Sequence, residues 1–153
     1  MSDPTGTWLL HRWHALKNDR PDGYPMGADA LGQIIYAADG HMCAFLMRAD
    51  FAASDGPATV ESCLSYGGGW RVEADVITHS VRFSSLPHWI GRPLIRHMRW
   101  HGDTLTLRTE PERSRAGNVY VHELIWRRPA PGPVQPNWAV TPLARKASTS
   151  ATE

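Results

Sequence analysis

The sequence predicts an all-β fold, an up-and-down antiparallel β-barrel of about eight strands. Apolar and polar residues alternate with a period of two along most of the chain, and glycine, proline, asparagine or aspartate bounds each alternating run. Several runs come in pairs around short turns, which is typical of antiparallel hairpins. The chain has 153 residues, of which 42% are hydrophobic, so we expect one domain with one core.

The predicted strands follow one another along the chain, and closing them into a barrel would remove exposed sheet edges. The alternating runs are 5–16, 32–49 with a turn at Asp39-Gly40, 70–85 with a turn around 73–75, 93–111 with a turn at Gly102-Asp103, and the closing run 118–128.

Two segments depart from this pattern. Residues 58–65, ATVESCLS, predict one short helix between strands. The barrel domain is expected over residues 1–128, and residues 129–153 form a proline-rich tail. Within that tail, residues 137–143 are apolar enough to dock on the domain or on a neighbouring subunit, and the chain from Ala144 is expected to be loose.

Charge and motifs exclude several classes of protein. The formal net charge is +1, from 16 Lys and Arg against 15 Asp and Glu, so the chain lacks the field that attracts nucleic acid or anionic lipid. No apolar run approaches the about 18 residues needed to cross a membrane, and we expect a cytoplasmic protein. Cys43 and Cys63 lack paired-ligand spacing and are expected to be buried free thiols. Without a phosphate-binding loop, a dinucleotide fingerprint or a zinc motif, we expect neither cofactor nor metal.

An ordered set of short motifs adds to this prediction. They are Gly6-Thr7-Trp8, Tyr24–Gly27, Gly32–Tyr36, Asp39–Met42, Tyr66–Trp70, 78–91 and the closing Glu123–Arg128. From about Gly6 to Arg128 the chain resembles the small stand-alone lipocalin-like domain family, whose members form calycin-type barrels. The resemblance implies either a carrier of apolar ligands or a cofactor-independent enzyme of a biosynthetic pathway. It also implies an inward Trp8 covered by a closing arginine.

His79 is the first candidate catalytic residue. In the run 76–84, alternation places His79 on the same face as Ile77, Val81 and Phe83, so the imidazole should point into the barrel. One interpretation is a core histidine satisfied by a carbonyl or hydroxyl group. The other is a general acid or base that desolvation keeps neutral at pH 7.

Arginine 96 is the second candidate. It shares the apolar face of its run with Leu94 and Met98, and an interior guanidinium is costly without a partner. The partner would be the carboxylate of Glu123 or Glu61, or an oxygen atom of a ligand.

These observations lead to three hypotheses. The first is an isomerase, cyclase or lyase with three catalytic residues: His79 as acid or base, Arg96 as clamp and Tyr66 as a further donor. The second is a carrier of a hydrophobic ligand, and the third is a structural barrel, filled by Arg12 and Trp13, that works through dimerisation. The expected partner is a small apolar or aromatic molecule, with a homodimer as an option. The predicted ligand-binding residues are Tyr36, Trp70, Phe83, His88, Trp89, Met98 and Arg12.

Overall fold

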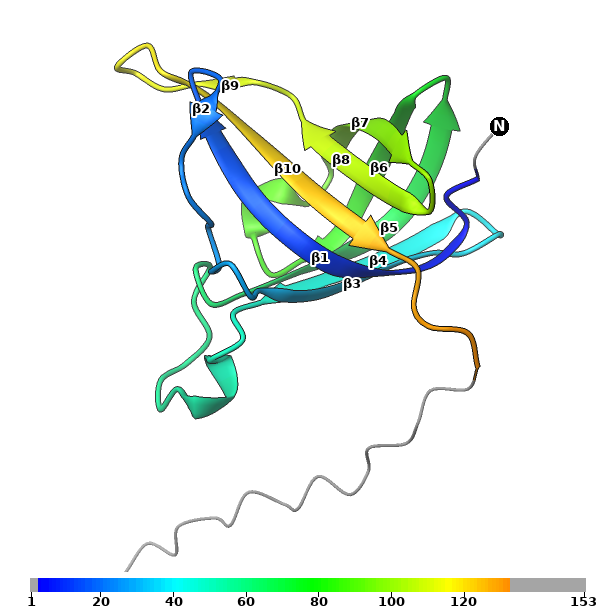
Figure 1. Cartoon of the computed structure of the whole chain (residues 1–153), viewed down its shortest axis with the longest axis horizontal. Helices are drawn as coiled ribbons and strands as arrows, with labels where there is room; N and C mark the ends of the chain where they lie inside the picture. The colour runs from blue at the N-terminus through cyan, green and yellow to red at the C-terminus, as the bar shows by residue number, and fades with distance from the viewer. Residues whose placement is uncertain (1–2, 133–153) are drawn as a thin grey trace, which may run out of the picture.

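The computed structural model describes residues 3–132, and these fold into a closed antiparallel β-barrel (Figure 1). This confirms the predicted fold class. The proline-rich tail lies outside the described residues from position 133 on, and so does its apolar segment 137–143.

Within residues 3–132, eight long strands make the wall, each hydrogen-bonded to the next, and β1 also pairs with β10 to close the barrel. Their bounds are β1 (Gly6–Lys17), β3 (Leu31–Tyr36), β4 (His41–Met47), β5 (Cys63–Glu73), β6 (Val76–Ser84), β7 (Pro93–His101), β8 (Thr104–Thr109) and β10 (Val119–Arg127). Two short strands, β2 (Arg20–Pro21) and β9 (Glu112–Arg113), pair with β1 and β10.

The helix predicted over 58–65 is wrong. Thr59 to Ser62 forms a turn, in which the Thr59 carbonyl accepts from the backbone N–H groups of Ser62 and Cys63. Strand β5 starts at Cys63, and Leu64 is buried opposite Leu46 of β4. Pairing with β4 thus overrides a weak local preference for helix. The helical segments of the described chain are the short 3₁₀ turns η1 (Phe51–Ala53) and η2 (Pro87–Trp89).

A β-bulge in β1 reverses one of the predicted faces. The register against β10 shifts between Leu10 and Arg12, so His11 and Arg12 are both exposed and Trp13 turns inward. The prediction that Arg12 points into the barrel is therefore wrong. A bulge adds one residue to a strand, which shifts the alternation of every residue after it.

A second bulge has the same effect on β6. The register shifts between Gly67 and Gly68 of β5, which face Phe83 and Val81 of β6, and Arg82 is left between them. Phe83 consequently lies on the outer wall with 55% of its surface exposed. The expectation that Phe83 faces the interior is wrong for the same reason.

The core fills one end of the barrel. Trp8 is buried there, its indole N–H donates to the Pro4 carbonyl at 2.8 Å, and the Arg128 guanidinium lies 3.8 Å from the ring centroid. Trp100 packs against Trp8, with ring centroids 5.8 Å apart. The first residues of β1, β4 and β8 and the last residues of β3, β7 and β10 meet at this end, and the opposite end remains hollow.

Candidate functional site

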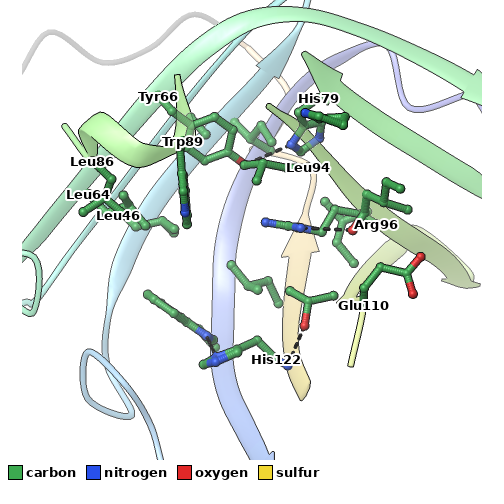
Figure 2. Close-up of a pocket in the computed structure, with 18 of the residues that line it drawn as sticks. Leu46, Leu64, Tyr66, His79, Leu86, Trp89, Leu94, Arg96, Glu110 and His122 are labelled. Atoms are coloured by element: carbon green, nitrogen blue, oxygen red, sulfur yellow. Dashed lines mark hydrogen bonds between the residues drawn. The ribbon is translucent and has the colours of Figure 1, made fainter. Parts of the chain in front are cut away.

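The hollow end of the barrel contains a cavity of about 540 Å³ (Figure 2). This volume suits a drug-sized molecule, since ligand pockets commonly measure roughly 300–1,000 Å³. Exposed residues, among them Val60, His88, Glu110 and Glu112, contribute to its lining. The apolar part of the wall consists mainly of Trp13, Leu46, Leu64, Leu86, Trp89, Leu94, Leu107, Leu124 and Trp126.

His79 lies in the cavity wall between two tyrosines. Its side chain is 0% exposed, its Nε2 is 2.7 Å from the Tyr36 hydroxyl, and its Nδ1 is 2.9 Å from the Tyr66 hydroxyl. Burial lowers the pKa of His79 well below its ordinary value of 6.5, and the nearby Arg96 guanidinium lowers it further. The imidazole is therefore neutral at pH 7, with both ring nitrogens hydrogen-bonded.

Three strands bring this group together, which we call the inner row: Tyr36 ends β3, Tyr66 lies on β5 and His79 on β6. All three are buried on inward faces. Gly68 of β5 pairs with Met42 of β4, and Met42 pairs with Tyr36 of β3, so these three residues lie at one level of the barrel. Burial raises the pKa of both phenols, that of Tyr36 well above its ordinary value of 10.0, so both keep their protons at neutral pH.

Arg96 supplies the positive charge of the cavity. It is half-buried on β7, and its guanidinium donates to the carbonyl of Ile95 at 3.0 Å. Within residues 3–132 no carboxylate lies within ion-pair distance of it, so of the two alternatives for Arg96 the ion pair with Glu123 or Glu61 is wrong. Glu123 pairs instead with Arg108, at 3.6 Å. The structure places Arg96 and His79 in the lining of one cavity, as predicted.

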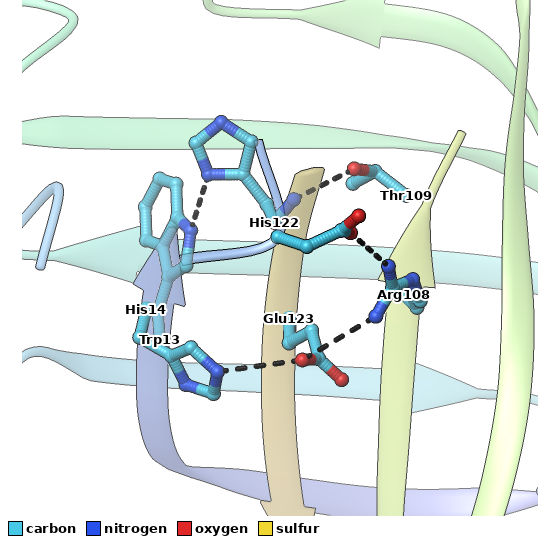
Figure 3. A network of polar contacts seen from close by, with 7 residues as sticks. Trp13, His14, Arg108, Thr109, His122 and Glu123 are labelled. Atoms are coloured by element: carbon cyan, nitrogen blue, oxygen red, sulfur yellow. Dashed lines mark hydrogen bonds and ion pairs between the residues drawn. The ribbon is translucent and has the colours of Figure 1, made fainter. Parts of the chain in front are cut away.

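A second histidine of the cavity was missed by sequence reasoning. The indole N–H of Trp13 donates to Nδ1 of His122 at 3.0 Å, so the ring proton of neutral His122 is on Nε2 (Figure 3). Burial lowers the pKa of His122, with Glu112 opposing that shift. The alternation of Trp126, Leu124 and His122 along β10 could have identified it as an inward residue.

The other predicted ligand-binding residues divide into two groups. Trp89 lines the cavity with its ring against Tyr66, at a centroid distance of 5.4 Å, and His88 lies exposed at the rim. Trp70 and Met98 belong to the filled end, where the indole of Trp70 donates to the Ala37 carbonyl at 2.8 Å. Tyr36 is outside the cavity lining and contacts it through His79.

Other kinds of site were considered for the described chain. From residue 3 to residue 132, no three His, Cys, Asp or Glu side chains are close enough together to hold a metal ion. No described helix is long and apolar enough to span a membrane. Both cysteines are free, but Cys43 is exposed on the outer wall and Cys63 is half-buried, so the prediction that both are buried is wrong.

Comparison with known proteins agrees with the geometry. A family model described as a lipocalin-like domain matches residues 5–129, which is almost the whole barrel. No curated protein matches the chain.

Proposed function

The chain belongs to the lipocalin-like domain family, and we propose that its barrel binds one small apolar molecule through a carboxylate or carbonyl oxygen of that molecule. The observation that carries this proposal is Arg96. Its guanidinium lines an apolar cavity without a carboxylate partner in residues 3–132. Even a half-buried cation in an apolar wall is stabilised when an anion or a strong acceptor meets it, and a ligand oxygen would do so.

The rest of the polar wall favours the same ligand chemistry. His122 has its ring proton on Nε2, and Trp126, 2% exposed, has an indole N–H without a partner in the described chain. These groups donate hydrogen bonds. The carboxylates that line the cavity, Glu110 and Glu112, are exposed to solvent, and Glu110 is 3.2 Å from His97. The deeper wall therefore suits a ligand that accepts hydrogen bonds.

A catalytic role is the second candidate, as a cofactor-independent isomerase, cyclase or lyase. The hydrogen-bonded inner row favours it, because a phenol beside a guanidinium can stabilise a developing enolate oxygen. His79 would then exchange protons with the substrate only through Tyr66, since both of its nitrogens are engaged. Exchange of α-protons of a bound ketone with D₂O, followed by NMR, distinguishes catalysis from binding alone.

Three matched probes test the binding proposal: 2-naphthylacetate, 2-(2-naphthyl)ethanol and 2-(2-naphthyl)ethylamine. Their affinities are measured by isothermal titration calorimetry at pH 7. We expect the carboxylate to bind most tightly and the ammonium most weakly. Arg96→Met should weaken the carboxylate by at least about tenfold, because a hydrogen bond to a charged group contributes about 1.5–3 kcal/mol. The alcohol should change by less than about threefold.

Arg99→Met is the matched control, because Arg99 lies on the same strand with its side chain exposed. It should leave all three affinities unchanged. Equal affinity of the three probes for the native protein, or an equal loss in both arginine variants, would contradict the proposal. Native mass spectrometry of the purified protein is the complementary measurement, because it identifies a co-purifying molecule directly.

A further inference from the structure

We infer that the hydrogen bonds of the inner row run in one direction, from Tyr36 to His79 to Tyr66, so that the Tyr66 hydroxyl always donates into the cavity. A neutral imidazole has one N–H donor and one bare nitrogen acceptor. His79 must therefore donate to one tyrosine and accept from the other, and the protein decides which.

The Tyr36 end sets the direction. The side chain of Tyr36 is 0% exposed and lies outside the cavity lining, and in residues 3–132 its hydroxyl makes one hydrogen bond, to Nε2 of His79. If this oxygen accepted from Nε2, its own proton would be buried without an acceptor. Such an unsatisfied donor costs about 1–3 kcal/mol. Tyr36 therefore donates, and Nε2 is the bare nitrogen.

The position of the ring proton of His79 then follows. With Nε2 bare, the single proton of neutral His79 is on Nδ1, which lies 2.9 Å from the Tyr66 hydroxyl. The ring donates to this oxygen, so the Tyr66 proton cannot point back at the ring. It turns instead to the cavity, which Tyr66 lines together with Arg96.

Tyr36 and His79 are therefore positioning residues, and Tyr66 is the member of the inner row that contacts the ligand beside Arg96. A hydroxyl locked as a donor beside a guanidinium selects a carbonyl or carboxylate oxygen and disfavours an ammonium group. This choice of ligand rests on the proposed function, whereas the direction of the hydrogen bonds does not.

The direction is tested on the native protein by long-range ¹⁵N–¹H NMR of the histidine rings at pH 7. The expected spectrum for His79 has the proton on Nδ1 and a bare Nε2. His122 should show the opposite tautomer, because Trp13 can only donate to its Nδ1, and it serves as the internal reference. A proton on Nε2 of His79, or rapid exchange between its two tautomers, overturns the inference.

The consequence for recognition is tested with Tyr36→Phe, which removes a hydroxyl that is not in the cavity lining. Without the Tyr36 donor the His79 proton is no longer fixed on Nδ1, so Tyr66 can turn its proton back to the ring. We expect 2-naphthylacetate to bind about 3- to 10-fold more weakly, the range of one hydrogen bond, and Tyr66→Phe to lose a similar factor. Tyr24→Phe, with Tyr24 47% exposed, is the control and should bind normally.

The outcomes separate the two proposals. Loss of affinity in Tyr66→Phe but not in Tyr36→Phe overturns the positioning role while the proposed function stands. A His79 proton on Nδ1 in a protein that binds none of the naphthyl probes overturns the proposed function and leaves the direction of the hydrogen bonds intact. Because the tautomer is read from the native protein, poor folding of a variant does not affect that part of the test.

Discussion

Two polar rows in this barrel each contain a histidine and join residues from three strands, but they lie on opposite sides of the wall. The inner row is Tyr36, His79 and Tyr66. The outer row is His14, Glu123 and Arg108, which are in register on β1, β10 and β8 (Figure 3). The inner row has no charged member at neutral pH, whereas the outer row is built around the carboxylate of Glu123.

The contacts of the inner row are also shorter and more deeply buried than those of the outer row. Inside, the contacts are 2.7 and 2.9 Å, and each of the three residues is at most 7% exposed. Outside, Glu123 lies 3.5 Å from His14 and 3.6 Å from Arg108, and these side chains are 15–31% exposed. Arg108 is also 3.9 Å from the exposed Asp19. Water can replace the outer contacts but not the inner ones. Burial therefore restricts the inner row to one arrangement of hydrogen-bond donors and acceptors.

The largest expected effect on stability comes from a substitution that disturbs the backbone beside the inner row. A Cβ on Gly68 would lie 2.0 Å from the Ser80 carbonyl oxygen, which is backbone and cannot rotate away. We expect Gly68→Ala to lower the free energy of unfolding by about 3 kcal/mol or more, measured by urea denaturation.

Gly69→Ala is the matched control for this change. At Gly69 the nearest atom to an added Cβ is the Gly40 carbonyl oxygen at 3.5 Å, an ordinary contact. The substitution should cost less than about 1 kcal/mol. Equal costs at the two glycines would show that the close approach of the Ser80 carbonyl oxygen does not exclude a side chain at position 68.

A smaller effect is expected from truncating the two histidines. His79→Ala leaves a cavity and removes the partner of two buried phenols, so we expect a loss of about 2–3 kcal/mol in the free energy of unfolding. His14→Ala removes a partly exposed ion contact and should cost less than about 1 kcal/mol. Similar losses in both variants would contradict the difference drawn between the two rows.

The pH dependence of stability gives the smallest and most specific effect. His79 has a depressed pKa in the folded protein, so below pH 6.5 the unfolded chain binds a proton that the folded chain does not. The free energy of unfolding should therefore fall as the pH drops below 6.5, by up to about 1.4 kcal/mol per pH unit from this group. Urea denaturation at pH 7 and at lower pH measures it.

Two variants show whether His79 is the source of that slope. His14→Ala should keep the full slope, whereas His79→Ala should reduce it and leave the part that His122 and His11 contribute through their own lowered pKa values. An unchanged slope in His79→Ala would mean that other groups govern acid stability.

Alternation predicted the inward positions of His79 and Arg96 because residues two apart on a regular strand share a face. The same rule failed for Arg12 and Phe83. In each case a bulge lies between the residue and the earlier residues of the strand from which its face was inferred. Alternation assumes an unbroken strand. The glycine run Gly67–Gly69 of β5 lies opposite the bulge of β6 and could have indicated it, but β1 has no comparable marker.

The sequence by itself determined the closed antiparallel barrel and the interior positions of His79 and Arg96, because period-two patterns and turns are local properties of the chain. The tertiary structure alone decided that the cavity stays hollow, that Arg96 lacks a carboxylate partner and that both nitrogens of His79 are engaged. These features depend on register and contact between residues far apart in the chain. Tyr36 and His79 are 43 positions apart, and the packing of strands between them brings their atoms within hydrogen-bond distance.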